Sequence, residues 1–222
     1  MTAVSDEVFV DYRRFCEEQW GITIVEKNES KLMKVLAVVL FFNKGFMTNY
    51  VTTIGKKVHW PNADKLTGKD FTTLFHEVQH AVDFTKGPAW FILSYLLPQI
   101  LALFVLMSFL ALTGNLFWLL ALPWVLMLAP LPSITRAHWE LRGYSCEMAY
   151  VLWTRGYVPS HMLRRIKKEF TSSAYYFMWP FSRSMDRKLE KAEKSILNCE
   201  LTEVQEETAR FLVHHGVVEE SV

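Results

Sequence analysis

The chain has 222 residues and a formal net charge of +1, which gives no basis for a nucleic-acid partner. Its length allows one domain with a proper core, or a domain that carries a membrane insert. The three cysteines, Cys16, Cys146 and Cys199, are widely spaced and form no CxxC pair. Their pattern predicts reduced thiols in a cytosol-facing protein rather than a disulfide framework.

The first sixty residues predict two helices and three strands. Residues 5–19 are typical of an amphipathic helix, and residues 30–42 predict a helix buried in the core. The stripe expected to face the core in the first helix consists of Val8, Tyr12 and Phe15. A β-branched run at 22–25 predicts a strand, and residues 48–60 predict a hairpin that turns at Gly55-Lys56.

The next helix is expected to begin with Asp70 as its cap and to run to about Phe84. It contains His-Glu-x-x-His, formed by His76, Glu77 and His80. On a helix, residues four apart project from one face, so the two imidazoles can bind one metal ion. Glu77 stands beside the first ligand, where it can reach a metal-bound water.

Residues 88–133 contain no Asp, Glu, Lys, Arg or His. Trp90–Leu112 is long enough for one transmembrane helix, and residues 113–115 predict a tight turn. Leu116–Leu131 is shorter and rich in proline, which favours a kinked span or a re-entrant arm. Possible interfacial aromatics are Trp90, Tyr95, Trp118 and Trp124. The alternative is a very apolar helical hairpin buried inside a soluble domain.

All 24 Lys and Arg residues lie outside this apolar block, 11 before it and 13 after it. A hairpin returns both flanks to one side of a membrane, and cytoplasmic segments are enriched in Lys and Arg. We therefore expect an inner or cell membrane protein, with the bilayer as a partner and its soluble parts in the cytoplasm.

The last third of the chain predicts helices over 135–153, from Ser160 onward, over 184–198 and over 201–215. The helix after Ser160 carries a basic cluster, made of Arg164, Arg165, Lys167 and Lys168. This cluster is either a solvated face or a contact with anionic headgroups. The aromatic segment 173–179 is a second candidate for the membrane interface.

Zinc hydrolases use three protein ligands and keep one position open for water. Glu140 is the best candidate for the third ligand, because it is the first carboxylate after Asp83. It follows His80 by 60 residues, and removal of the 45-residue insert 89–133 leaves about 15, a plausible connection between adjacent helices. Glu147 is the competitor, since it lies seven residues further on and shares a helical face with Glu140.

With these residues the chain resembles the gluzincin metallopeptidases. Its layout is similar to the membrane family that includes the heat-shock membrane protease and the CAAX prenyl endopeptidase, in which a transmembrane hairpin follows His-Glu-x-x-His. The resemblance covers about residues 50–150 and implies zinc, one per chain, on His76, His80 and Glu140, with Glu77 as general base. It also implies that the strand before the metal helix binds an extended peptide, although an ordinary hairpin remains an alternative.

The expected fold is α+β and mainly α, with a zincin-like minimal metallopeptidase core, a small β-hairpin or sheet and an inserted transmembrane helical hairpin. Three parts are predicted. Residues 1–87 contain the edge strand and the His-Glu-x-x-His helix, and residues 88–133 form the transmembrane or re-entrant hairpin. Residues 134–222 contain the third-ligand helix.

The family has Ala and Asp at the positions of Gly143 and Tyr144, so its usual second carboxylate is either missing here or supplied by another residue. Asp83, one turn beyond the histidines, is the predicted substitute, because a ligand histidine usually donates its other N–H to such a group. The donors considered for the oxyanion are His138, Tyr144 and His161.

These features predict a zinc-dependent, membrane-associated metalloendopeptidase that hydrolyses a peptide or protein substrate. One alternative is a non-catalytic membrane adaptor on the same scaffold. The other is a membrane di-iron oxygenase, with His214-His215 as part of a second histidine box, although such sites need about eight histidines and this chain has seven.

Overall fold

The computed structural model describes residues 4–39, 44–128, 132–172 and 177–219. Over these residues the chain is mainly helical and contains one three-stranded sheet, which confirms the expected α+β class with mostly α structure. Residue contacts group the chain into two compact units. The first consists of Met1–Pro88, Arg142–Val158 and Lys191–Val222, and the second of Ala89–Leu141 and Pro159–Glu190. This grouping does not test the three consecutive parts predicted from the charge pattern.

The first unit begins with helix α1 (Asp6–Trp20), which Ser5 caps by accepting a hydrogen bond from the Val8 amide. Gly21 ends it with a φ of 66°, in the left-handed region that favours glycine. The buried stripe of α1 is shifted from the expected one and consists of Phe9, Tyr12 and Cys16. Both sets have helical spacing, so periodicity alone did not separate them.

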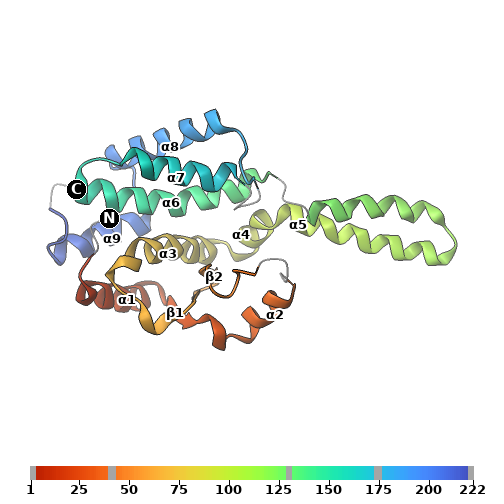
Figure 1. The fold of residues 1–222 in the computed structure, drawn as a ribbon, viewed down its shortest axis with the longest axis horizontal. Helices are drawn as coiled ribbons and strands as arrows, with labels where there is room; N and C mark the ends of the chain where they lie inside the picture. The colour runs from red at the N-terminus through yellow and green to blue at the C-terminus, as the bar shows by residue number, and fades with distance from the viewer. Residues whose placement is uncertain (1–3, 40–43, 129–131, 173–176, 220–222) are drawn as a thin grey trace. The chain divides into compact units, whose positions relative to one another are not determined.

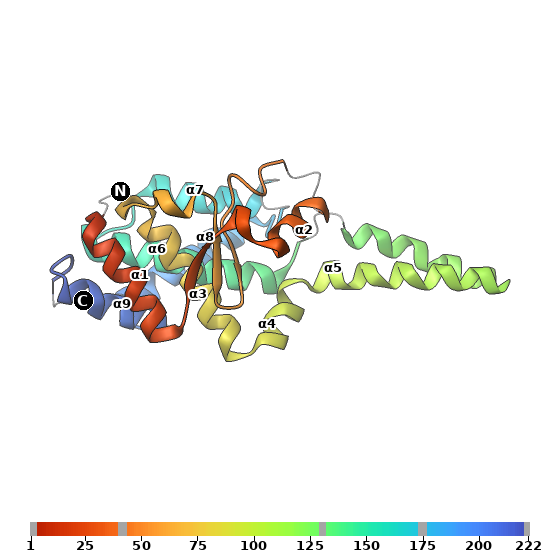
Figure 2. The same ribbon diagram turned by 90° about the horizontal axis from the view of Figure 1, so that it is seen from below.

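The sheet has the order β1-β3-β2. Strand β1 (Thr23–Glu26) pairs in parallel with β3 (Lys57–Trp60), and β2 (Thr52–Ile54) pairs with β3 in the antiparallel sense. Gly55, with a φ of 63°, makes the tight turn between β2 and β3, which confirms the predicted hairpin. Strand β2 therefore lies at an edge of the sheet, beside α3 (Figure 2).

Helix α2 (Lys31–Val39) corrects the expectation of a buried core helix over 30–42. Met33 is buried, whereas Leu32, Val35 and Val38 are 48%, 61% and 75% exposed. An apolar sequence is necessary for a core helix but does not supply the neighbours that would cover it. Residues 40–42 of the predicted segment lie outside the described residues.

Helix α3 (Phe71–Lys86) is the central element of the first unit, and almost every side chain up to Asp83 is buried. Asp70 does not cap it as expected. Its carboxylate instead accepts a hydrogen bond from the Thr67 amide at 2.9 Å, in the capping box of the short 3₁₀ helix η3 (Gly68–Asp70) that leads into α3. Two other 3₁₀ turns are η1 (Lys27–Glu29) and η2 (Ala63–Lys65).

The core of the first unit joins α1, α3, α6 (Ile134–Arg155) and α9 (Glu203–His214). The ring of Tyr12 lies 4.6 Å from that of Phe71 and 5.2 Å from that of Phe211, measured between centroids. The Tyr12 hydroxyl lies 3.0 Å from Oγ1 of Thr208, so its polar tip is satisfied inside the core. Thr202 caps α9 together with Gln205, so the helix begins two residues inside the predicted range 201–215.

The second unit contains the apolar hairpin (Figure 1). The predicted single helix Trp90–Leu112 is instead divided into α4 (Pro88–Tyr95), α5 (Leu97–Leu101) and η4 (Ala102–Thr113), with a bend at Leu96. Pro98 has no backbone N–H and is tolerated only in the first turn of a helix, which explains why α5 begins at Leu97.

The other arm of the hairpin is η5 (Leu116–Leu128), which runs beside η4 (Figure 1). Gly114, with a φ of 92°, forms the predicted turn between the arms. Residues 129–131 of the predicted second arm lie outside the described residues. Among the residues that the structure describes, no helix combines the length and the apolar character needed to cross a bilayer.

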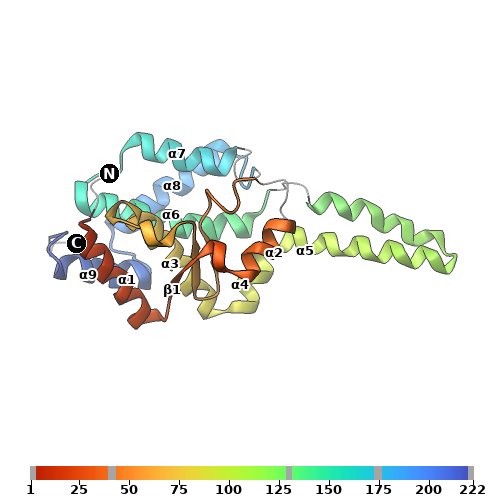
Figure 3. The same ribbon diagram turned by 60° about the horizontal axis from the view of Figure 1, so that its bottom comes forward.

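In the second unit, helix α7 (Ser160–Thr171) runs beside the first part of α8 (Ser182–Leu197), up to Glu190 (Figure 3). Lys167 on α7 and Asp186 on α8 form an ion pair at 2.7 Å. Helix α7 starts at Ser160, as predicted, and buries Met162, Ile166 and Phe170. Of the aromatic segment 173–179, residues 173–176 lie outside the described residues.

Cys16 leads to a prediction about stability at alkaline pH. Burial raises the pKa of this thiol well above its ordinary value of 9.0. Above pH 9 the unfolded chain loses the thiol proton while the folded protein keeps it, so the free energy of unfolding falls as pH rises. The slope from this group is at most about 1.4 kcal/mol per pH unit. Denaturant unfolding of Cys16→Ala should show a shallower fall than wild type above pH 9 and a parallel curve below pH 8.

Candidate metal centre

Helix α3 brings its two histidines together on one face. His76 and His80 are both buried, and their Nε2 atoms lie 3.1 Å apart. Phe75, Val78 and Val82 are also buried, so α3 is packed on its other faces as well. The spacing predicted from the sequence therefore produces the expected pair of converging imidazoles.

Helix α6 packs against α3 at Gly143. A Cβ atom at this position would lie 2.4 Å from Nε2 of His76, far inside van der Waals contact. The ring of Tyr144, the next residue, meets the His76 ring edge to face, with centroids 4.7 Å apart. Glycine is needed here because the backbone of α6 lies against the His76 ring of α3.

An ion pair fixes the register of these two helices. Arg142 donates from Nε and Nη2 to the two carboxylate oxygens of Asp83, each at 2.8 Å, and Asp83 is buried. Gln79 donates to Asp83 at 2.9 Å and accepts from Thr202 at 2.8 Å. Asp83 thus lies one turn beyond His80, as expected, and serves to hold α6 against α3. Its predicted role as the carboxylate behind a ligand histidine stays a prediction.

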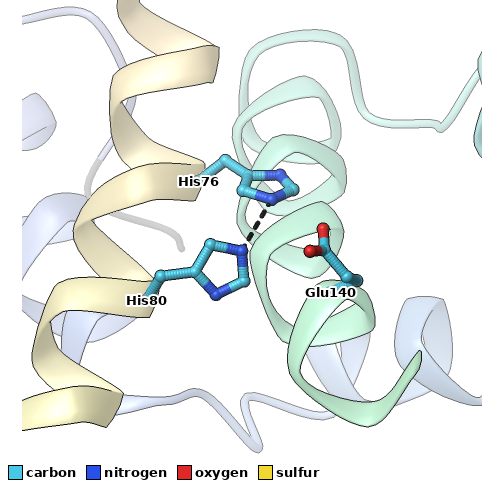
Figure 4. Close-up of side chains that lie close together, drawn as sticks. All are labelled: His76, His80 and Glu140. Carbon is cyan, nitrogen blue, oxygen red and sulfur yellow. Dashed lines mark hydrogen bonds between the residues drawn. The ribbon is translucent and has the colours of Figure 1, made fainter. Parts of the chain in front are cut away.

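Glu140 lies on α6 one turn before Tyr144, and its carboxylate joins the two imidazoles in one buried group (Figure 4). One ligand atom from each of the three residues lies within 4.8 Å of the other two. In the described part of the chain this is the one group of three or more His, Cys, Asp or Glu that could hold a metal ion. Two histidines and a glutamate form a ligand set that suits zinc in a hydrolytic site.

Glu147, the competing carboxylate, lies behind His76. Its Oε1 is 3.0 Å from Nδ1 of His76, and both side chains are buried. A carboxylate at Nδ1 favours the tautomer that leaves Nε2 free to bind a metal. The structure therefore places Glu140 and Glu147 in different positions, one beside the two Nε2 atoms and one on the opposite side of the first imidazole.

Glu77 faces the edge strand. Its Oε2 accepts a hydrogen bond from Oγ1 of Thr53 on β2 at 2.6 Å, and the side chain is half-buried. A carboxylate next to the first histidine and partly open to solvent suits a general base, which must exchange protons with water. The sequence did not single out Thr53, because a threonine in a strand is ordinary.

Lys27 was also missed by sequence reasoning. Its side chain is fully buried, and Nζ donates to the Phe46 and Tyr50 carbonyls, both at 2.6 Å, and to Thr52 at 2.8 Å. Burial lowers the pKa of Lys27 to about 8, and the charge of Glu77 opposes this shift. Lys27 therefore holds the segment that leads into β2, next to the threonine that contacts Glu77.

Tyr95 on α4 donates a hydrogen bond to Oε1 of Glu140. The sequence indicated Tyr95 as a possible interfacial aromatic, but the side chain is half-buried and its hydroxyl orients the candidate third ligand. A hydrogen bond to a ligating carboxylate fixes its orientation and is typical of metal sites.

The other predicted site residues are the oxyanion donors and the His214-His215 pair, and most of them are exposed or contact residues outside the group. His138 and His161 are exposed, and His138 packs on the ring of Trp139. Of the predicted oxyanion donors, Tyr144 is the one whose ring contacts a histidine of the group. His214 is exposed, and His215 lies against the Phe211 carbonyl of its own helix and 3.6 Å from Asp11.

Comparisons of the chain with protein-family models, with curated proteins and with solved structures found no match.

Proposed function

We propose that the chain is a zinc-dependent metalloendopeptidase of the gluzincin type, with a zincin-like core. The observation that carries this proposal is the buried group of His76, His80 and Glu140. Glu77, the residue after His76 on α3, and Glu147 on Nδ1 of His76 support it, because a hydrolytic site needs a base and oriented ligands. A purely structural zinc site has no need of a carboxylate at Glu77.

In this proposal the two histidines and Glu140 hold one zinc ion per chain. The ion would lower the pKa of a bound water toward about 7. Glu77 would take up a proton from the attacking water at its carboxylate and would pass it to the leaving amine of the cleaved peptide. Thr53 orients Glu77 through its hydrogen bond to Oε2, which leaves Oε1 for the water.

Strand β2 is the proposed binding edge for the peptide or protein substrate. It lies at the edge of the sheet, and its residue Thr53 contacts Glu77. An extended peptide can add to such an edge through backbone hydrogen bonds, which would carry its carbonyl past the base.

The proposal also includes association with a lipid bilayer through the apolar hairpin, as a span or a re-entrant arm. Large side chains on both arms of the hairpin are more than 60% exposed, among them Leu103, Phe109, Leu112, Leu116 and Phe117. Contiguous exposed apolar surface of this kind is unfavourable in water and favourable in lipid. The Lys and Arg of the flanks favour an inner or cell membrane with the soluble parts in the cytoplasm.

Metal analysis of the purified full chain tests the site. We expect about one zinc per chain by plasma emission, and loss of that zinc in His80→Ala and in Glu140→Ala. Glu147→Ala should weaken zinc binding about 10- to 100-fold without removing a ligand. His138→Ala is the matched control, because it changes an exposed histidine two residues from Glu140 on the same helix.

Hydrolysis completes this test. Casein cleavage by the zinc-loaded protein should stop when a chelator removes the metal and return when zinc is added back. Zinc binding without cleavage would favour the adaptor, and two iron ions per chain would favour the oxygenase. A chain that binds no metal would contradict the proposal.

A further inference from the structure

Three segments of the second unit meet at the base of the apolar hairpin. On the incoming side, the Ser94 carbonyl accepts a hydrogen bond from Oγ1 of Thr135, and Oγ of Ser94 accepts one from Nε1 of Trp139 at 2.9 Å. On the outgoing side, the Ser133 amide donates to the Met178 carbonyl at 3.0 Å. Met178, which precedes α8, is therefore hydrogen-bonded to Ser133, where the chain leaves the hairpin, and Thr135 joins this point to Ser94 on the incoming side.

This segment exposes large aromatic side chains. Phe177 is 44% exposed and Phe181 is 61% exposed, whereas Met178 is buried. Phe177 has a φ of 50°, which a bulky residue adopts only when its surroundings impose it. The Phe177 amide donates to the Ser172 carbonyl at 2.8 Å, and the Trp179 amide to the Phe170 carbonyl at 3.0 Å. The backbone thus holds Phe177 in place on the surface.

Helix α8 begins at once after these aromatics and is basic. Arg183 and Arg187 are exposed and lie four residues apart, on one face of the helix. Lys188 extends over the ring of Trp179, with Nζ 4.9 Å from the ring centroid. Asp186 is the one acidic residue from 177 to 188, and Lys167 on α7 pairs with it. The segment Phe177–Lys188 therefore carries uncompensated positive charge beside exposed aromatics.

We propose that Phe177–Lys188 is a membrane-interface contact that binds anionic phospholipid headgroups at the base of the hairpin. Aromatic side chains favour the headgroup level of a bilayer, and each basic residue close to an anionic surface adds to binding. The inference rests on the lipid association in the proposed function and is independent of the zinc chemistry. If the contact exists, binding of the protein to vesicles depends on the charge of the lipid. Binding through the apolar hairpin alone would not depend on it.

Vesicle flotation tests the contact. The full chain, purified in detergent, is diluted into preformed vesicles of phosphatidylcholine, with or without phosphatidylglycerol. We expect wild type to bind both kinds and to favour the anionic vesicles strongly at low salt. Arg183→Gln with Arg187→Gln should reduce binding to the anionic vesicles about 30-fold and leave binding to phosphatidylcholine unchanged. Phe181→Ser should weaken binding to both kinds.

Arg164→Gln with Arg165→Gln is the matched control, because it removes two exposed arginines from α7 and changes the net charge equally. An equal loss in the control and test pairs would mean that total charge, not this contact, attracts the lipid, and would overturn the inference. Equal binding of wild type to neutral and anionic vesicles would also overturn it while leaving the hairpin's role intact. Wild type that binds neither would overturn both, and the zinc measurement would be unaffected.

Discussion

Replacement of Glu77 with glutamine is expected to abolish casein hydrolysis and to leave zinc binding intact. Glutamine has the shape of glutamate and can still accept the hydrogen bond that Thr53 donates at 2.6 Å. It cannot take up a proton at neutral pH, so the water loses its base and the leaving amine loses its acid. Loss of such a group lowers the rate by about 10²- to 10⁴-fold. Cleavage assays and plasma emission on the same preparation measure both quantities.

Thr53→Val is the companion variant, since valine has a similar shape and no hydroxyl. It should retain zinc and Glu77 and show a smaller loss of activity, because the base remains but is oriented less well. If Glu77→Gln cleaved casein at the wild-type rate, Glu77 would not be the base. That result would favour the non-catalytic adaptor. Equal loss of zinc and activity would instead indicate that Glu77 supports the fold of the site.

Elements with strong local signals were predicted well from the sequence. The hairpin turn was evident because glycine suits the positive φ of Gly55. The start of α7 was predicted at Ser160, and α9 begins two residues inside the predicted range 201–215 because Thr202 caps it. Each of these signals depends on residues within one turn of each other.

Elements that depend on distant neighbours were predicted less well. The apolar residues of α2 favoured a core helix, yet most of its face is exposed because other elements decide what covers it. The break between α4 and α5 at Leu96 depends on Pro98 alone. The high hydropathy of the surrounding apolar run favours a continuous helix.

The candidate site shows the same division. His76 and His80 follow from local spacing on one helix. Glu140 and Glu147 could not be separated by periodicity, because residues seven apart share a helical face. The packing of α6 on α3 distinguishes them, and that packing depends on Gly143. Thr53 contacts Glu77, and Lys27 contacts the neighbouring Thr52, only in the folded protein, so no sequence pattern links these residues.

Gly143→Ala is expected to disrupt the metal site and destabilise the fold. The added methyl group would lie 2.4 Å, 2.5 Å and 2.7 Å from Nε2, Cδ2 and Cε1 of His76. Either the imidazole turns away from the group or α6 moves away from α3, and both changes weaken zinc binding. Overpacking of this kind typically costs about 1–3 kcal/mol. Zinc content and denaturant unfolding of the variant measure the two effects.

The direction of the stability change in Gly143→Ala distinguishes a close contact with His76 from an open helix surface. In a helix that touches nothing, alanine is more stable than glycine by about 1 kcal/mol. The same substitution in a His76→Ala background removes the clashing ring, so there Gly143→Ala should be neutral or stabilising. A double-mutant cycle of the two changes therefore isolates their contact. If Gly143→Ala stabilised the otherwise wild-type chain and kept its zinc, α6 could not approach His76 this closely, and Glu140 would lose the helix placement that makes it the candidate third ligand.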